Sequence, residues 1–547
     1  MTAGPLSLVL AGLSHLPAGL SHLPAGLPGA AIDDFQAPYI DYGRLLPVII
    51  VFGVAVLGVL VEALVPAQSR YRVQSVLAIL GVVVAGVFVV RLGTDLPGGL
   101  GRTVASGTVA IDGPGLFLQG TILALALLSL LLVSERGLES GGSPFTSSAY
   151  ALPGSDAERE ADRSGRFQTE VYPLMMFAIA GMMVFACAND LLVMFIALEV
   201  LSLPLYLLCG MARRRRLLSQ ESAMKYFLLG SFSSAFFLYG IALVYGYAGT
   251  LQLGAISASL DATVGQSGLL LAGVGLLSVG LLFKVGAAPF HAWTPDVYQG
   301  APTPITGFMA ACTKVAAFGA LLRVFYVGLG GLRWDWRPMM FVVAVLTMAV
   351  GSVVALFQSD IKRMLAYSSI AHAGFVLTGI VAVDRVGVSA VLFYLAAYGF
   401  TTVGAFAVVT MVRNSTGEAG AISDWAGLGR RSPVVAGVFS LFLLGFAGIP
   451  LTSGFTAKFA VFNAASGAGQ STLVVVGVLA SAIAAFFYAR IIVLMYFSDA
   501  DGDGPTVAVP SALTSIAVAV GVAATVLLGV LPQVVLDLAD SASTLVR

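Results

Sequence analysis

Apolar segments of about 20 residues recur along almost the whole chain, and each is long enough to cross a bilayer as an α-helix. The segments lack the alternation of apolar and polar residues that a transmembrane β-barrel requires. Only 10% of the 547 residues are charged, whereas soluble domains average about 25%. The sequence therefore predicts an all-α integral membrane protein.

Fourteen membrane spans are predicted from these segments. They cover residues 45–64, 73–90, 115–134, 171–187, 191–211, 222–247, 268–289, 303–326, 339–357, 363–382, 387–411, 434–462, 472–497 and 511–530. Residues 45–134 would hold the first three helices, and residues 135–170 a polar cytoplasmic connection. Residues 511–530 would form the last helix.

The first 44 residues are not expected to form a helix. The sequence SHLPAGL occurs twice in tandem, at Ser14–Leu20 and Ser21–Leu27, so that proline and glycine interrupt the apolar residues. There is no basic segment at the start, which argues against an ordinary signal peptide. Residues 1–44 are interpreted as a flexible tail outside the membrane, or as the result of a start site placed too early.

The distribution of positive charge predicts the orientation of the chain. With the N-terminus outside, the cytoplasmic loops hold fifteen basic residues and the outer segments hold seven. Cytoplasmic loops of membrane proteins are enriched in Lys and Arg, so both termini are predicted outside. The formal net charge is zero, and no basic patch suggests a nucleic-acid partner.

Four of the five lysines fall inside predicted spans: Lys225, Lys284, Lys314 and Lys458. A charge at the centre of a bilayer costs several kcal/mol on the lower scales, so it needs a partner, water or a protein interior. A buried lysine can release its proton near neutral pH, whereas arginine stays protonated. Lysine inside the membrane therefore indicates proton transfer, and the alternative is a structural role in which lysines hold the helices together.

The other basic residues fit this contrast. Outside the spans they are arginines except Lys362, which is placed in a cytoplasmic loop. Arg323 and Arg490 lie toward the ends of predicted helices, from which a long side chain can reach the membrane surface.

Glu199 is the one carboxylate in the middle of a predicted span. A nearby lysine would keep it ionised, and Lys225 on the next helix is the expected partner. His291 and His372 are the histidines of the membrane region, and imidazole can shuttle protons near neutral pH.

Two spans contain residues that interrupt helices. Gly286 and Pro289 follow Lys284, and Gly448 and Pro450 precede Lys458. Proline removes a backbone hydrogen bond, and a carbonyl freed at membrane depth needs protein or water around it. Broken helices in matching places predict two inverted five-helix repeats, at residues 171–326 and 339–497.

No cofactor site is predicted in the chain. The three cysteines, Cys187, Cys209 and Cys312, all fall in predicted spans and form no C-x-x-C pair. An iron–sulfur cluster, a zinc site and a disulfide framework are therefore not expected.

Three stretches resemble the antiporter-like subunits of bacterial respiratory complex I, the NADH-quinone oxidoreductase. They are KVGAAPFHAWTPDVYQGAPTPITGFMAACTKVAAF (Lys284–Phe318), QSDIKRMLAYSSIAHAGF and GIPLTSGFTAKF. The resemblance covers about Val171–Phe497. Among the L, M and N types, the loop TPDVYQGAPTP, the segment ACTKVAAF, Lys458 and the short C-terminal end are similar to the N type.

The resemblance implies a proton-translocating subunit in a bacterial cell membrane. Glu199, Lys225, Lys284, Lys314 and Lys458 would then form a hydrated axis with His291 and His372. This chain would bind no cofactor, while the complex would use NADH, FMN, iron–sulfur clusters and a quinone. Its partners would be the other membrane subunits, including the other antiporter-like ones, and lipid. The alternatives are an Mrp-type cation/proton antiporter subunit and the equivalent subunit of a membrane hydrogenase or a deazaflavin-linked dehydrogenase.

Overall fold

The apolar segments of the sequence form α-helices in the structure, a computed structural model. It describes residues 40–96, 101–138, 143–146, 151, 155–163, 168–260, 267–414, 417–499 and 504–546. Within these residues twelve helices are long and apolar enough to span a membrane, and two more, Val171–Cys187 and Pro433–Ala447, are shorter but also apolar. The predicted all-α membrane fold is confirmed, and the number of crossings stays a prediction. The tandem SHLPAGL repeat lies outside the described residues.

The first half of the chain supplies seven long or apolar helices and a small hairpin. They are α2 (Tyr42–Leu64), α3 (Ala67–Thr94), the antiparallel strands β1 (Arg102–Val104) and β2 (Val109–Ile111), α4 (Gly113–Val133), α6 (Val171–Cys187), α7 (Leu191–Cys209), α8 (Arg216–Ala248) and α10 (Ser267–Val285). The short helices α5 (Asp156–Arg163) and α9 (Leu253–Leu260) lie in connections. The described part of the predicted polar connection 135–170 thus contains the helix α5.

A continuous helical segment, Thr303–Gly328, follows the short helix α11 (Trp293–Gly300). It contains α12 (Thr303–Phe308), a π-helical turn η3 (Met309–Thr313), α13 (Lys314–Leu322) and a second π-helical turn η4 (Arg323–Gly328). Such π turns within helices frequently occur at functional sites. Here they adjoin the two basic residues of the segment, Lys314 and Arg323.

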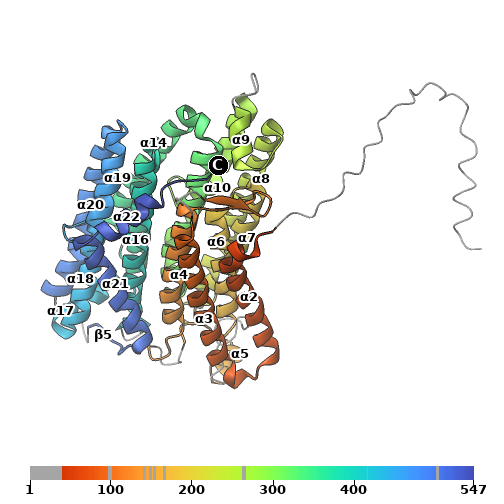
Figure 1. The fold of residues 1–547 in the computed structure, drawn as a ribbon. Helices are drawn as coiled ribbons and strands as arrows, with labels where there is room; N and C mark the ends of the chain where they lie inside the picture. The colour runs from red at the N-terminus through yellow and green to blue at the C-terminus, as the bar shows by residue number, and fades with distance from the viewer. Residues whose placement is uncertain are drawn as a thin grey trace, which may run out of the picture. The chain divides into compact units, whose positions relative to one another are not determined.

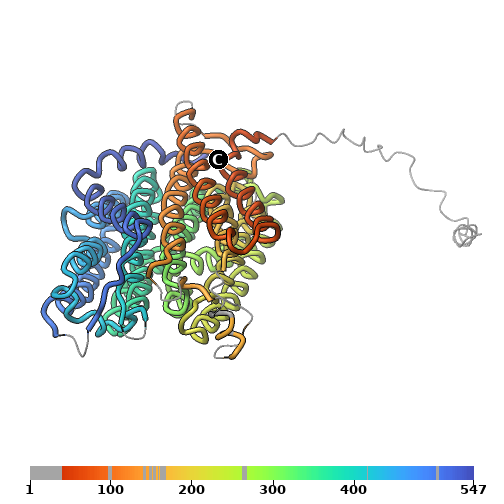
Figure 2. The backbone as a smooth tube through the Cα atoms, turned by 90° about the horizontal axis from the view of Figure 1, so that it is seen from below, coloured from red at the N-terminus to blue at the C-terminus, as the bar shows by residue number. Residues whose placement is uncertain are grey.

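The second half continues with six long or apolar helices and half-helices. They are α14 (Arg333–Ala355), α15 (Ile361–Val381), α16 (Arg385–Met411), α18 (Pro433–Ala447), α19 (Ser453–Gly467) and α20 (Ser471–Phe497). Two further helices, α21 (Ala512–Val530) and α22 (Gln533–Ser541), end the chain. The turn η6 (Ile422–Trp425), α17 (Leu428–Arg431) and a three-stranded sheet in the order β4 (Gly417–Glu418), β3 (Val412–Asn414), β5 (Thr506–Val507) lie in connections. Figures 1 and 2 both show these helices beside those of the first half.

Aspartates start several of the helices. The side chains of Asp41, Asp112, Asp190, Asp360 and Asp384 each accept a hydrogen bond from a backbone N–H in the first turn of α2, α4, α7, α15 and α16, respectively. An Asp in front of an apolar run satisfies a donor that the helix itself leaves open. This arrangement explains why the helices begin where the apolar runs begin.

The helices differ in how much of them the protein covers. The most apolar 18-residue stretch of Thr303–Gly328 is wholly buried inside the protein, and the same stretches of α15 and α16 are 94% buried. In α2 and α21 only 22% of the corresponding stretch is buried. Thr303–Gly328, α15 and α16 therefore form the interior, where polar side chains can be shielded from lipid.

Two predictions about basic residues are wrong. Lys362 does not lie in a loop but in the first turn of α15, where its side chain is buried. Arg323 does not reach the membrane surface. It is buried and pairs with the equally buried Asp112, at 2.5 Å between Nη2 and Oδ1.

Candidate functional site

The two predicted interruptions are present beside the buried lysines. Helix α10 ends at Val285, Gly286 takes a positive φ of 75°, and the chain becomes helical again at Trp293. Helix α18 ends at Ala447, Gly448 takes a φ of 80°, and α19 begins at Ser453. Each interruption leaves carbonyl groups without a helical N–H partner.

Lys284 stands one residue before the end of α10 and bonds only to neutral groups. Its Nζ donates to Ser202 Oγ at 2.8 Å and to Tyr226 Oη at 3.1 Å. The same Nζ lies 5.3 Å from the centre of the Tyr226 ring, which adds a cation–π attraction. Ser202 is three residues after Glu199 on α7, so the two side chains share one face of that helix.

Glu199 lies three residues before Ser202, which binds Lys284, but it is not paired with Lys225. Its Oε1 is buried and has no hydrogen-bond partner, and no ion pair of Glu199 occurs among the described residues. The expected contact between Glu199 and Lys225 is therefore absent from this structure.

Lys225 instead pairs with acidic groups outside the predicted spans. Its Nζ is 2.8 Å from Asp296 Oδ2 on α11 and 2.7 Å from Glu221 Oε1 one turn earlier on α8. Arg363 Nη1 binds the other oxygen of Asp296 at 2.5 Å. Burial alone would raise the pKa of Asp296, but the hydrogen bonds from Lys225 and Arg363 outweigh it and lower that pKa below its usual value. Asp296 thus stays ionised and joins α8, α11 and α15.

Lys314 binds the carbonyl that the first interruption frees. Its Nζ donates to the carbonyl oxygens of Val285, at 2.9 Å, and Ser369, at 2.8 Å. In an unbroken helix the Val285 carbonyl would accept from the N–H four residues later, but that residue is Pro289, which has none. The lysine on the neighbouring helix replaces the missing donor.

Lys458 repeats this arrangement in the second half. Its Nζ donates to the carbonyl oxygens of Phe446, at 3.0 Å, and Ala447, at 2.9 Å, and to Ser481 Oγ at 2.7 Å. The residue four positions after Phe446 is Pro450, so this carbonyl also lacks its helical donor. Lys314 and Lys458 thus bind the freed carbonyls in the same way. The match of Lys284 with Lys458, which the sequence pattern favoured, stays a prediction.

The three buried lysines share one electrostatic character. The exposed fractions of Lys284, Lys314 and Lys458 are only 4–5%. Within the described part of the chain, none of them lies within ion-pair distance of a carboxylate. In a buried ion pair, loss of the lysine proton would leave the carboxylate charge unpaired. Neutral carbonyls and hydroxyls, in contrast, can bind both the ammonium and the neutral amine form of lysine.

His372 lies between Lys314 and Lys458. It follows Ser369, whose carbonyl binds Lys314, by three residues on α15. His372 Nδ1 is 2.7 Å from Tyr394 Oη. The Phe446 ring, whose backbone carbonyl binds Lys458, is centred 5.5 Å from the imidazole. Shared neighbouring residues thus connect Lys284, Lys314, His372 and Lys458 in this order, and these four residues are called the lysine line.

His291 does not join this line directly. It lies half-buried between α10 and α11, with its ring centred 6.4 Å from that of Tyr367. No hydrogen bond links it to Lys284 or Lys314 in the described residues, and its Nδ1 is buried without a side-chain or backbone partner.

Sequence reasoning missed the groups that hold the lysines. They are the hydroxyls of Ser202, Tyr226 and Ser481 and the backbone carbonyls of Val285, Ser369, Phe446 and Ala447. Two carbonyls had a signal in the sequence, because each stands four residues before a proline. The hydroxyls had none, since serine and tyrosine occur throughout the spans.

The helical membrane fold is that of an antiporter-like membrane subunit, as comparisons with known proteins show. Residues 188–484 match the family model described as the transmembrane part of NADH:quinone oxidoreductase and Mrp antiporter. NADH-quinone oxidoreductase subunit N of Rhodococcus opacus is 61% identical over 93% of this chain and 97% of its own length. Subunit N of Mycobacterium tuberculosis is 56% identical over 93% and 99%, respectively.

Solved structures are similar over nearly the whole chain. A chain of respiratory complex I from Thermus thermophilus, solved with aureothin, has a TM-score of 0.71 and 33% identity, and the match covers 90% of this chain and 98% of that one. A chain of the Mrp complex from Dietzia has a TM-score of 0.74 with 21% identity over 91% and 97%, which shows a shared fold alone. The chain belongs to the family of NADH-quinone oxidoreductase subunit N.

Proposed function

We propose that Lys284, Lys314, His372 and Lys458 carry protons along the interior of this subunit. As a member of its family, the chain is an antiporter-like, proton-translocating membrane subunit of NADH-quinone oxidoreductase, and the complex couples quinone reduction to proton transfer. The NADH, FMN, iron–sulfur clusters and quinone of the complex belong to other subunits. The chain's partners are the other membrane subunits.

The observation that supports this route is the neutral surroundings of the lysines. Each ammonium is held by carbonyl or hydroxyl oxygens rather than by a carboxylate. A permanent ion pair would favour the charged lysine in every state, so that a proton could leave only at high cost. Neutral acceptors allow a lysine to lose and regain its proton when charges nearby change.

Glu199 and Lys225 supply such a change of charge. Glu199 is three residues before Ser202, which binds Lys284, and Lys225 is 2.8 Å from Asp296 in this structure. Movement of Lys225 from Asp296 toward Glu199 would neutralise the carboxylate that favours the charged form of Lys284. His291 would serve as a water-linked connection beside the first interruption.

The test replaces Lys284 with alanine in the assembled complex. The expected result is a lower number of protons pumped per NADH oxidised in membrane vesicles, because the line loses its first member. The buried serine Ser352 on α14, replaced by alanine, is the control for a change in the interior. Full stoichiometry in a correctly assembled Lys284→Ala complex would overturn the assignment.

The orientation of the chain is part of the same proposal. The sequence assigns fifteen basic residues to the predicted cytoplasmic loops and seven to the predicted outer segments. This distribution supports a bacterial plasma-membrane protein with both termini outside. A single cysteine introduced at Thr544, near the C-terminus, should react with a membrane-impermeant maleimide from the outer side of intact cells. Labelling only after the cells are opened would contradict this orientation.

A further inference from the structure

A second polar site lies apart from the lysine line. It is a cavity of about 330 Å³ between the loop after α7 and the loop after α16. Lys362, which lines it, is seven residues from Ser369 on α15, or about 10 Å of helix. Neither the predicted proton route nor the family relationship assigns this cavity a role.

The charged residues in the lining of the cavity are mainly positive. Arg213, Arg214, Arg215 and Lys362 lie around it, with Glu418 as the acidic residue of its lining. Arg215 is also 3.9 Å from Asp360, and Arg213 and Arg214 have partners of their own, so a ligand would share these cations. Cationic side chains outnumber carboxylates here, which favours an anionic occupant over a metal ion or a proton.

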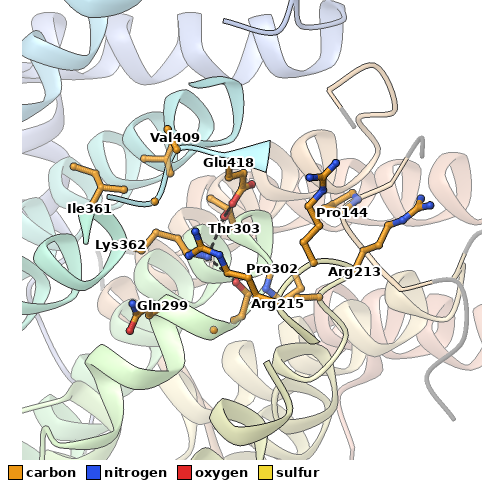
Figure 3. Close-up of a pocket in the computed structure, with 16 residues that line it drawn as sticks. Pro144, Arg213, Arg215, Gln299, Pro302, Thr303, Ile361, Lys362, Val409 and Glu418 are labelled. Carbon is orange, nitrogen blue, oxygen red and sulfur yellow. Dashed lines mark hydrogen bonds between the residues drawn. The ribbon is translucent and has the colours of Figure 1, made fainter. Parts of the chain in front are cut away.

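The polar groups of the cavity are fixed by one another. Lys362 Nζ donates to the Ala301 carbonyl at 3.0 Å and to Thr303 Oγ1 at 3.2 Å. Thr303 Oγ1 donates to Glu418 Oε2 at 2.6 Å, which occupies one oxygen of that carboxylate. Figure 3 shows Lys362, Thr303 and Glu418 side by side, with Arg215 beside them and Arg213 extending to one side.

Glycine keeps the arginines close to the backbone of the opposite loop. A Cβ at Gly420 would lie 2.8 Å and 2.9 Å from the two terminal guanidinium nitrogens of Arg215. The arginines come from the first half of the chain, whereas Lys362, Glu418 and Gly420 come from the second. Any ligand in the cavity would therefore touch both halves.

We propose that this cavity binds a phosphate-bearing anion, which bridges the two halves of the subunit. Arginine matches phosphate with paired N–H donors, and lysine adds a point charge. The volume admits a phosphate group with a substituent. The same chemistry is offered by the headgroup of an anionic phospholipid and by a soluble phosphate compound.

The test measures how fast phenylglyoxal, an arginine reagent, modifies Arg215 in the intact complex. The complex is placed in nanodiscs of phosphatidylcholine, of phosphatidylcholine with phosphatidylglycerol, or of phosphatidylcholine with added inorganic pyrophosphate at matched ionic strength. Peptide mass spectrometry reads Arg215 and, as the control, Arg430, which lies outside the cavity lining and pairs with Asp499. Binding should slow modification of Arg215 by about tenfold and leave that of Arg430 unchanged.

Two variants separate binding from general shielding. Lys362→Gln should weaken the protection by about tenfold, and Glu418→Gln, which removes the opposing charge, should strengthen it. Protection by phosphatidylglycerol alone identifies a lipid, and protection by pyrophosphate identifies a soluble phosphate. The proposal is wrong if neither phosphatidylglycerol nor pyrophosphate slows the reaction at Arg215. It is also wrong if the reactions at Arg215 and Arg430 are slowed equally. Recovery of this subunit's peptides with the purified complex confirms that each variant is assembled, so these outcomes do not depend on proton pumping.

Discussion

At the scale of single residues, Lys458 shows how a cation is accommodated inside this protein. An ammonium has three donor hydrogens, and Lys458 has three neutral acceptors in Phe446, Ala447 and Ser481. The Phe375 ring lies 4.7 Å away and adds a cation–π attraction. The surroundings stabilise the charge without fixing it by a counter-charge.

Replacing Lys458 with arginine should separate charge from proton release. A guanidinium can use the same carbonyl oxygens, so the complex is expected to assemble, but it does not lose its proton in a protein. The number of protons pumped per NADH oxidised should therefore fall, as measured with a pH-sensitive dye in vesicles. Unchanged pumping would mean that Lys458 contributes only its charge.

At the scale of helices, the feature that provides acceptors for the lysines is a proline four residues after a backbone carbonyl. Pro289 and Pro450 each leave one carbonyl without its helical donor, and a lysine takes that place. Gly448 at φ 80° and Leu451 at φ 71° turn the chain between α18 and α19. The interruptions thus create the polar acceptors that buried lysines need.

Pro450→Ala should return a backbone N–H that competes with Lys458 for the Phe446 carbonyl. Loss of the proline changes stability by less than about 1 kcal/mol through the unfolded chain, so assembly should persist. Proton pumping should fall because the lysine loses an acceptor. Pro338→Ala in α14 is the matched control, and an equal effect of both substitutions on pumping would contradict this explanation.

The sequence predicted the elements better than the contacts between them. Apolar length located the helices, and the prolines located both interruptions. The partner of Lys225 could not be predicted, because Glu199 and Asp296 are both acidic and only the packing of α11 on α8 brings Asp296 within 2.8 Å. Arg323 was misplaced for the same reason, since Asp112 lies 211 residues earlier in the chain.

At the scale of the whole subunit, Asp112 joins three distant segments. Its Oδ1 caps α4 and binds Arg323 of η4, and its Oδ2 accepts from the backbone of Val546 near the C-terminus. The exposed fractions of Asp112 and Arg323 are 0% and 1%. Each charge needs the other as its partner, because neither side chain reaches a surface exposed to water.

Arg323→Leu should destabilise the subunit by about 3–5 kcal/mol, because it leaves the Asp112 carboxylate buried and unpaired. The measure is the yield of assembled complex and its thermal unfolding temperature. Adding Asp112→Asn to this variant should recover part of the loss, since the amide carries no charge. A single variant as stable as the original chain would show that this pair is not needed.

The carbonyls vacated at the two prolines have a consequence for genetics. A backbone oxygen cannot be deleted by any codon change, so a mutational screen would find the lysines and the prolines but never the atoms to which the lysines bind. The four backbone carbonyls that bind the lysines are therefore invisible to side-chain scanning. An amide-to-ester replacement at the bond that contains the Phe446 carbonyl, which weakens that oxygen as an acceptor, would expose it directly.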